Sequence, residues 1–491
     1  MKKKILGAIC LSMAVAFTVP LAACGGGSGD DLNEDGTWWT TTGELNKDAN
    51  GNVVFDDISL RLSTIVSGVD KTPFGDIIAQ FNAEYRGKIN INTVYLQGEN
   101  FEKDVTMKVQ QNANNAPDVI MLHQESLKGF LDYKVIQPYD LAMKETGVEI
   151  DLTAFAQGVN QYSKAGTEYQ FGVPFDAAGM VVYYNKDLLK EITGSDAVPQ
   201  TRSELLSVCK QFKDKNPENY PISWESSGDF FCQYLMPTAV LQNGGYLYND
   251  DPKSKGYLYA NWFNNGIQRG IYKDAIQSVR SYIDSGYAKL GVHEMSGATD
   301  FSQNKSIFYV TMPWYRENIV SGYATLNKIT EAEAEEKISG ASVSGWFAMS
   351  DETSDNAKKI YGDSHMFAMT KSVKDVTKKA AVCEFVKWFT QRADVGAQWA
   401  EAGHVTLSNT IATSTTYTEN KNVVNFIDNW YPHLDSFTTM GITPYYSTVS
   451  ENLKTLLSES LLLKNPQESD YLDLIKTKQN ALNSKIDLLK M

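Results

Sequence analysis

The stretch Gly172–Leu188 reads GVPFDAAGMVVYYNKDL and decides the fold class. Its apolar segment Gly179–Tyr184 has the length and composition of a buried strand. The polar residues Asn185-Lys186-Asp187 then lead into a segment with a helical pattern. A strand that passes directly into a helix is the unit from which α/β folds are built, so we expect an α/β protein.

The same alternation runs upstream of this stretch. Ile58–Ile65 predicts a strand, Phe74–Tyr85 an amphipathic helix, and Ile89–Thr93 a second strand. Phe101–Val109 continues with a helical face, and Asp118–Leu122 predicts a short buried strand. Such alternation indicates βαβ units with parallel sheets.

Downstream segments are mainly helical. Thr201 and Glu204 have the spacing of a capping box at the start of a helix. Val382–Phe389 carries an apolar stripe, and Val449–Leu489 predicts a helical tail. The charged run Thr330–Lys337 is typical of a surface helix or loop.

Size and composition limit the class of protein. A chain of 491 residues is too long for one ordinary core, which predicts two lobes. The formal net charge of −14 argues against nucleic-acid binding, which needs clustered lysine and arginine. The 26 tyrosines and 9 tryptophans are an aromatic surplus that suits a binder of sugars, whose C–H faces stack on aromatic rings.

The N-terminus predicts export. Lys2–Lys4 is basic, Ile5–Pro20 is apolar, and Leu21-Ala22-Ala23-Cys24 resembles the lipobox of bacterial lipoproteins. We therefore expect a signal peptide at 1–23, a lipidated Cys24, and anchoring to the outer face of the cell membrane. Residues 24–55 would form a flexible tether and a short N-terminal extension. The alternatives are an ordinary cleaved signal and a buried cysteine after an apolar helix.

The remaining cysteines predict no disulfide framework. Cys209, Cys232 and Cys383 form an odd and sparse set. Cys209 and Cys383 lie within apolar helical patterns, so we expect both to be buried thiols.

Five segments carry a family resemblance. Ala116–Val119 contains a Pro-Asp-Val strand entry, Gly172–Leu188 ends in Tyr-Tyr-Asn-Lys-Asp-Leu, and Val198–Leu205 has a Pro-x-Thr-x-x-Glu-Leu pattern. Met312-Pro313-Trp314 has proline where glycine is common, and Ala381–Leu407 looks like the closing helices without their usual proline. Together they resemble the carbohydrate class of bacterial extracellular solute-binding proteins, which includes maltose-binding protein. The resemblance spans about residues 58–410.

The resemblance implies a two-lobed periplasmic-binding-protein-like fold with a hinge and a ligand cleft between the lobes. The chain would cross between lobes near Val173–Val181 and near Asp363–Phe367. The expected boundaries are residues 56–175 with 366–412 for lobe 1, and residues 176–365 with 413–491 for lobe 2.

The resemblance also implies a function. The protein would capture a carbohydrate, most readily an oligosaccharide, and deliver it to the permease subunits of an ABC importer. It would act as a monomer without a cofactor and without catalysis. Two alternatives stay open: a ligand sensor for a membrane receptor, and a secreted glycoside-processing enzyme.

Candidate ligand-binding residues follow from the same resemblance. Trp314 occupies the position of a stacking tryptophan, and Glu125 stands where the family places an acidic acceptor for sugar hydroxyls. Its neighbours His123 and Gln124 share the loop after a predicted strand, where α/β sheets bind ligands. Asp176 and His365 are candidates at the two crossings, and Asp70 and Lys71 follow the first predicted strand. The remaining candidates are Trp224 with its neighbour Glu225, Trp346 and, more weakly, Trp262. For the tryptophans, packing in the core is the competing interpretation.

Enzymatic and metal signatures are weak. The sequence has no G-x-S-x-G, no G-x-x-x-x-G-K-[ST] and no G-x-G-x-x-G motif, and its five histidines lack ligand spacing. Asn46-x-Asp48-x-Asn50-Gly51, with Asp57 in the twelfth place, resembles a calcium loop. An Asn-Gly turn between two short strands explains that loop well. We therefore expect no metal site, with Asp48, Asn50 and Asp57 as the one alternative.

Overall fold

The structure is a computed structural model of the chain. It describes residues 37–96, 99–155, 160–224, 229–246, 260–290, 296–420, 437–438 and 445–489. The predicted signal peptide and Cys24 lie outside these ranges. The chain from Trp39 onward is one compact unit, and the account below concerns that unit.

The first lobe is built on a six-stranded mixed sheet. Its strands run in the order β2-β1-β3-β12-β4, and β5 also pairs with β12. The pairings of β1 with β2 and with β3 are parallel, whereas β12 is antiparallel to each of its partners. The strands are β1 (Ile58–Thr64), β2 (Ile89–Tyr95), β3 (Val119–His123), β4 (Ile136–Gln137), β5 (Gly172–Pro174) and β12 (His365–Thr370).

Helices cover this sheet, and aromatic rings fill the space between them. Phe81 of α1 lies 5.1 Å, ring to ring, from Phe385 of α13, and Phe74 lies 5.8 Å from Phe389. Edge-to-face contacts of this kind add to the burial of apolar area. The helices are α1 (Lys71–Glu84), α2 (Glu99–Gln110), α3 (Leu127–Asp132), α4 (Tyr139–Thr146), α13 (Val376–Gln391), α14 (Ala393–Glu401), α15 (Asn409–Ala412) and α16 (Thr415–Thr418).

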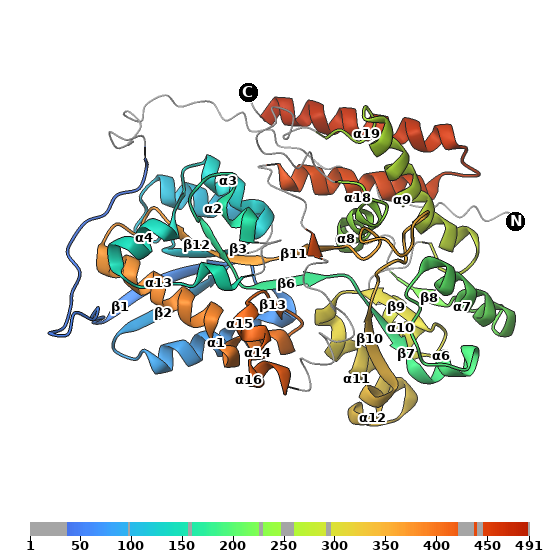
Figure 1. Cartoon of the computed structure of the whole chain (residues 1–491), viewed down its shortest axis with the longest axis horizontal. Coiled ribbons are helices and arrows are strands. Elements are labelled where there is room, and N and C mark those ends of the chain that lie inside the picture. The colour runs from blue at the N-terminus through green and yellow to red at the C-terminus, as the bar shows by residue number, and fades with distance from the viewer. Residues whose placement is uncertain are drawn as a thin grey trace, which may run out of the picture. The chain divides into compact units, whose positions relative to one another are not determined.

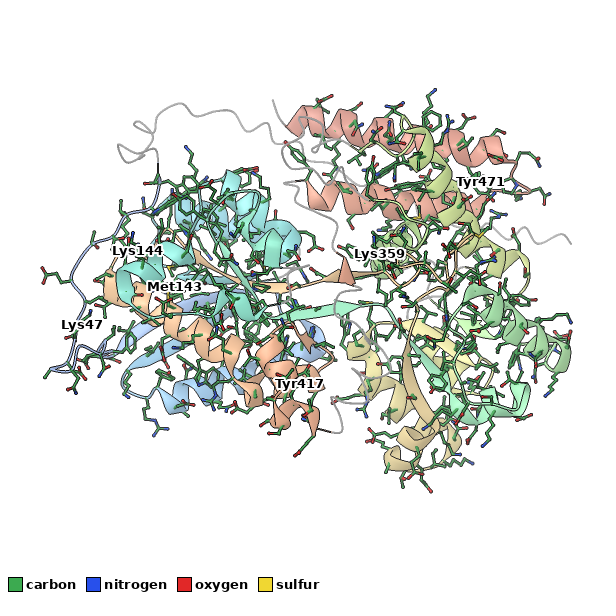
Figure 2. The ribbon with its side chains drawn as sticks, viewed as in Figure 1. Lys47, Met143, Lys144, Lys359, Tyr417 and Tyr471 are labelled. Carbon is green, nitrogen blue, oxygen red and sulfur yellow. The ribbon has the colours of Figure 1, made fainter. Side chains whose placement is uncertain are left out.

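The small helix α16 belongs to the packing of α14. Tyr417, labelled in Figure 2, is fully buried in a cluster with Ala397, Ala400 and Ile411. Its hydroxyl accepts a hydrogen bond from the backbone N–H of Thr406 at 3.0 Å.

The second lobe has a four-stranded sheet in the order β10-β7-β9-β8. Only β8 and β9 are parallel; β7 is antiparallel to both of its neighbours. The strands are β7 (Val181–Asn185), β8 (Ile222–Ser223), β9 (Phe308–Thr311) and β10 (Ile338–Ser342).

The helices of the second lobe enclose one large core. Val449, Leu453 and Leu456 of α18 are fully buried there, and so are Ile475 and Ile486 of α19. The helices are α6 (Lys186–Thr193), α7 (Arg202–Lys215), α8 (Asp229–Gln242), α9 (Gly266–Asp284), α10 (Ser296–Ser302), α11 (Arg316–Asn327), α12 (Glu331–Lys337), α18 (Tyr446–Leu462) and α19 (Glu468–Leu489).

A third sheet carries the chain between the two lobes, in the order β13-β6-β11-β14. Figure 1 shows β6 (Asp176–Gly179) and β11 (Ile360–Asp363) side by side, and the two are antiparallel, with Gly362 opposite Gly179. β6 follows β5 of the first lobe and precedes β7 of the second, while β11 leads into β12. The short strands β13 (Val405–Thr406) and β14 (Phe437–Thr438) pair at the two sides.

The structure confirms most of the predicted elements. The capping box is present: Thr201 accepts from the N–H of Glu204, whose side chain accepts from the N–H of Thr201. Thr330–Lys337 forms helix α12 with a capping box of its own. Cys209 and Cys383 are free and buried, as predicted. The predicted βαβ units are confirmed, because β1 pairs in parallel with β2 and with β3, but the sheets of both lobes also contain antiparallel strands.

The segment that resembles a calcium loop forms a hairpin turn. Lys47 and Val53 form an antiparallel bridge, and the Asp48 carboxylate accepts hydrogen bonds from the side-chain amide of Asn52 and from the N–H groups of Asn52 and Asn50. These bonds, that of the Asn52 side chain most of all, hold the pKa of Asp48 below its ordinary value. The carboxylate thus has local partners, which supports the Asn-Gly turn over a metal loop.

The described helices were also compared with the requirements of a membrane span. None of them combines the length and the apolarity that a bilayer crossing needs.

Candidate functional site

A cavity of about 550 Å³ lies where the crossing strands meet both lobes. This volume falls within the range of small-molecule sites. Its wall mixes aromatic rings with groups that can ionise: Tyr234, Trp314, Tyr315 and Trp399, with Asp70, His123, Asp363, His365 and His404.

The loops after two parallel strands deliver polar groups to this cavity. The segment Ile65–Asp70 follows β1 and ends in a short 3-10 helix, η1 (Gly68–Asp70). His123 is the last residue of β3, and η2 (Gln124–Ser126) follows it directly. The carboxyl ends of parallel strands meet at one edge of a sheet, which is where such sheets bind ligands.

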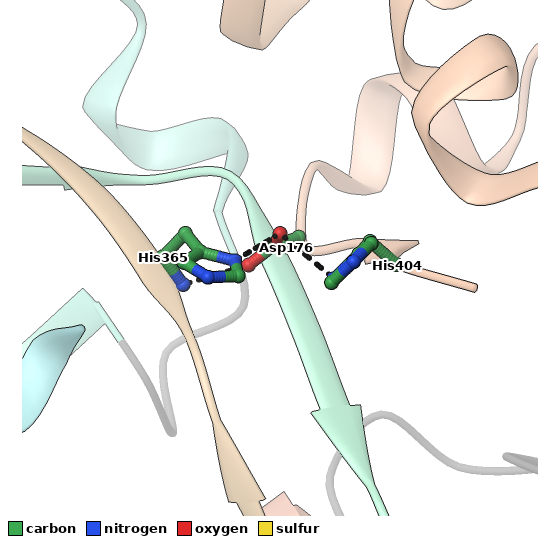
Figure 3. A group of neighbouring side chains, drawn as sticks. All are labelled: Asp176, His365 and His404. Carbon is green, nitrogen blue, oxygen red and sulfur yellow. Dashed lines mark hydrogen bonds and ion pairs between the residues drawn. The ribbon is translucent and has the colours of Figure 1, made fainter. Parts of the chain in front are cut away.

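Asp176 is the centre of a buried hydrogen-bond network. Its Oδ1 accepts from the backbone N–H of His365 at 2.7 Å. Its Oδ2 lies 2.8 Å from Nδ1 of His365 and accepts from Nε1 of Trp399 at 2.6 Å. Burial raises the pKa of Asp176, but the charge of His365 and these hydrogen bonds outweigh it and hold the pKa below its ordinary value. Figure 3 shows Asp176 between His365 and His404.

Because an ionised carboxylate only accepts, His365 must donate through Nδ1, and its Nε2 is not engaged by Asp176. The proton on Nδ1 is thus assigned from its partner. His365 is mostly buried and lines the cavity.

Glu125 and Asp363 form a second buried acidic pair. Burial, and then the charge of Asp363, raise the pKa of Glu125 well above its ordinary value. The Oε1 of Glu125 accepts a hydrogen bond from the hydroxyl of Tyr361, and its carboxyl group lies beside that of Asp363. Asp363 also contacts Nδ1 of His123, and burial lowers the pKa of that histidine.

His404 lies against two tryptophans. Its ring is nearly parallel to that of Trp399, with centroids 4.3 Å apart, and to that of Trp314, with centroids 5.8 Å apart. The neighbouring Gly403 has a φ of +98°, and a Cβ placed on it would lie 2.8 Å from the backbone nitrogen of Trp314. Only glycine permits this approach of the two segments without strain.

The structure brings several predicted site residues together. Trp314, Asp70, His123 and His365 line the cavity. Glu125 and Asp176 are buried behind it and hold the lining residues in place, and Gln124 is buried in the same turn.

Other candidates lie away from the cavity. Trp224, Trp262 and Trp346 are buried in the core of the second lobe, where Nε1 of Trp346 donates to the carbonyl of Pro199. Lys71 is exposed, and its ammonium group lies 5.5 Å from the ring centre of Tyr95. Core packing thus accounts for all three tryptophans, and Glu225 lies outside the described residues.

Five aromatic or ionisable residues of the cavity wall were not among the candidates from the sequence: Tyr234, Tyr315, Asp363, Trp399 and His404. Trp399 and His404 stand inside the segment that resembles the closing helices, but nothing in the sequence marks their side chains as cavity-lining. The histidines lack ligand spacing along the chain, yet His123, His365 and His404 converge in space.

Two lobes, joined by antiparallel crossing strands and with a polar and aromatic cavity where they meet, define a solute-binding protein of the hinged, two-lobed class. A sequence model described as "Bacterial extracellular solute-binding protein" matches residues 67–395. The chain belongs to this family.

Curated relatives match over a shorter segment. The sn-glycerol-3-phosphate-binding periplasmic proteins UgpB of Shigella dysenteriae and Escherichia coli are 26% identical over 177 residues, which cover 34% of this chain. The match spans 40% of the length of these relatives.

Solved structures share the fold over most of the chain. The sugar-binding protein MalE of Xanthomonas citri has a TM-score of 0.68 at 15% identity and covers 88% of this chain and 99% of its own. The cyclic alpha-maltosyl-1,6-maltose binding protein of Arthrobacter globiformis has a TM-score of 0.65 at 17% identity, covering 87% and 98%. The galacto-N-biose-/lacto-N-biose I-binding protein of Bifidobacterium longum has a TM-score of 0.64 at 15% identity, covering 88% and 97%.

Proposed function

We propose that the protein captures a carbohydrate in the cavity bounded by Trp314, Asp70 and His404 and hands it to the permease subunits of an ABC importer. The observation that carries the proposal is the combination of four aromatic rings with carboxylate and imidazole groups in one cavity. Aromatic rings stack on the apolar faces of a sugar, and carboxylate and imidazole groups bond its hydroxyls.

The charge of the cavity favours a neutral solute over a phosphorylated one. Among the described residues that line it, none is a lysine or an arginine, and Asp70 and Asp363 supply carboxylates. The nearby Arg316 is paired with Glu335. Phosphate sites use arginine or lysine to balance their charge, so the cavity does not suit the ligand of the UgpB relatives. Two solved proteins of this fold are named as binders of cyclic alpha-maltosyl-1,6-maltose and of galacto-N-biose and lacto-N-biose I.

Capture would use the crossing strands β6 and β11 as a hinge. A ligand that contacts both lobes stabilises the closed arrangement through its additional contacts there. We propose the lobe boundaries given above, with the first lobe extended through α16 because Tyr417 packs against α14, and the first crossing at β6. The importer would recognise the closed form.

We also propose that Cys24 carries a lipid, so that a monomer is held at the outer face of the cell membrane. Support comes from the basic, apolar and Leu-Ala-Ala-Cys sequence of the N-terminus. Replacing Cys24 with Ala should release the protein from the membrane fraction, and retention of the variant there would contradict the anchor.

The capture itself is tested by a thermal-shift screen of the protein against mono- and oligosaccharides, with glycerol 3-phosphate and amino acids as controls. A ligand at a hundred times its dissociation constant stabilises a protein by about 2.7 kcal/mol, which gives a clear shift. We expect a sugar to shift the transition and to be recovered unchanged. A response to glycerol 3-phosphate alone, or conversion of the sugar, would contradict the proposal.

A further inference from the structure

Three histidine rings meet beside the cavity. The ring centres of His123 and His365 are 4.9 Å apart, and those of His365 and His404 are 5.3 Å apart. The whole sequence has five histidines, so most of them gather here. Histidine is the commonest protein ligand for transition metals.

His404 and Asp70 face each other with unused hydrogen-bonding atoms. His404 is 2% exposed, and neither of its ring nitrogens has a hydrogen bond. Its Nδ1 lies 3.5 Å from Oδ2 of Asp176, and its Nε2 lies 3.5 Å from Oδ2 of Asp70. The buried Oδ1 of Asp70 also lacks a hydrogen bond. Buried polar atoms in folded proteins are nearly always satisfied, so these atoms point to a missing partner.

The spacing of these atoms fits a shared metal ion. Nε2 of His404 lies 3.5 Å from Oδ2 of Asp70, with no hydrogen bond between them. Ligands at about 2.0–2.1 Å from a tetrahedral zinc ion lie about 3.3 Å from one another. The pair is therefore already spaced as two ligands of one ion.

His365 is oriented for the same task. Its Nδ1 is held by Oδ2 of Asp176 at 2.8 Å, which leaves Nε2 as the nitrogen available to a metal ion. Metal-binding histidines usually have one nitrogen fixed by a carboxylate in this way. One ligand atom each from Asp176, His365 and His404 lies within 4.8 Å of the other two, so both histidines lie around the same carboxylate (Figure 3). Asp70 adjoins this group through its contact with Nε2 of His404.

We propose that His404, His365 and Asp70 bind a divalent transition-metal ion of the zinc class beside the cavity. Two nitrogen ligands and one carboxylate favour zinc, cobalt or nickel over calcium and magnesium, which prefer oxygen ligands alone. Asp176 acts as the orienting carboxylate, since three donors already occupy it. The fourth position of such an ion is open to the cavity. This inference goes beyond sugar capture and does not depend on it.

The test titrates the metal-stripped full-length protein with Co²⁺ and Zn²⁺ in the absence of any sugar. We expect one ion per chain, visible as the absorption bands of tetrahedral Co²⁺ and displaced by Zn²⁺, with no response to Mg²⁺ or Ca²⁺. His404→Gln and His365→Gln should each weaken Co²⁺ binding at least tenfold. Asp70→Asn, at a partly exposed side chain, should weaken it without endangering the fold.

Asp48→Asn is the matched control, because it changes an acidic residue in the N-terminal hairpin and should leave binding unchanged. Circular dichroism of each metal-free variant checks that it is folded. Absence of stoichiometric binding, or full binding by all three cavity variants, would overturn the site. Sugar binding is measured separately on the stripped protein, so either proposal can fail while the other stands.

Discussion

The indole Nε1 of Trp399 donates to Oδ2 of Asp176 at 2.6 Å, and both side chains are almost completely buried. The bond ties helix α14 of the first lobe to β6, the strand through which the chain leaves that lobe. Asp176 in turn fixes His365 at the start of β12. The carboxylate of Asp176 thus connects the two crossing segments to each other and to Trp399 and His365 in the cavity wall.

Trp399→Phe should therefore destabilise the protein. It removes one of three donors from a buried carboxylate, and such a loss costs about 1–3 kcal/mol. Trp388→Phe is the control, because the Nε1 of Trp388 donates to Glu84, a carboxylate near the surface. Urea denaturation of both variants measures the difference. Equal losses of unfolding free energy in the two variants would show that the hydrogen bond to Asp176 stabilises the protein no more than the one to Glu84.

Glu125→Gln should stabilise the protein at neutral pH. The folded pKa of Glu125 is raised, so this carboxyl group favours folding below its unfolded pKa and loses that contribution as pH rises through the folded value. A tenfold difference between the acid dissociation constants of the folded and unfolded states corresponds to about 1.4 kcal/mol of stability. Glutamine keeps an acceptor for Tyr361 and a donor for Asp363 without ionising.

The measurement is the melting temperature of both proteins between pH 5 and pH 8. The melting temperature of wild type should fall relative to that of Glu125→Gln as the pH rises from 5 to 8. Glu125→Ala, which removes the hydrogen bonds as well, should be less stable than wild type at every pH. Parallel pH profiles for wild type and the glutamine variant would contradict a raised pKa of Glu125 in the folded protein.

Gly403→Ala should weaken ligand binding at least tenfold. The added Cβ would lie 2.8 Å from the nitrogen of Trp314 and 3.0 Å from the carbonyl carbon of Pro313, so the cavity wall has to move. Gly194→Ala is the control: its φ of +82° carries the same backbone cost, but no atom lies within 4 Å of the new Cβ. If both variants bind equally well, the approach of Gly403 to Trp314 does not shape the site.

The local elements of the fold could be predicted from the sequence because their signals are local. The periodicity of apolar residues predicts the ends of β1, α1 and β2 to within a few residues. The Thr201–Glu204 capping box can be recognised from the sequence itself. Strand pairing was predicted less well. β12 lies between β3 and β4 and pairs antiparallel with both, although the paired residues are more than 200 positions apart in the sequence. No local sequence pattern predicts such a pairing.

The site was predicted in part. Trp314, Asp70, His123 and His365 follow strand ends or family motifs, and they line the cavity. Trp224 and Trp346 are also tryptophans, yet both are buried in the core of the second lobe. A large apolar ring suits a core as well as a sugar site, so the sequence does not distinguish the two. His404 was missed because what marks it as a site residue is its contact with Asp70, Asp176 and Trp399. These residues come together only in the folded chain.

The central claim is sugar capture in the cavity at Trp314, and isothermal titration of the sugar found in the screen tests it most directly. We expect one site per chain, an affinity at least a hundredfold lower in Trp314→Ala, and an unchanged affinity in Trp346→Phe, which perturbs only the core. Unchanged affinity in Trp314→Ala, or binding of glycerol 3-phosphate in place of any sugar, would contradict the account.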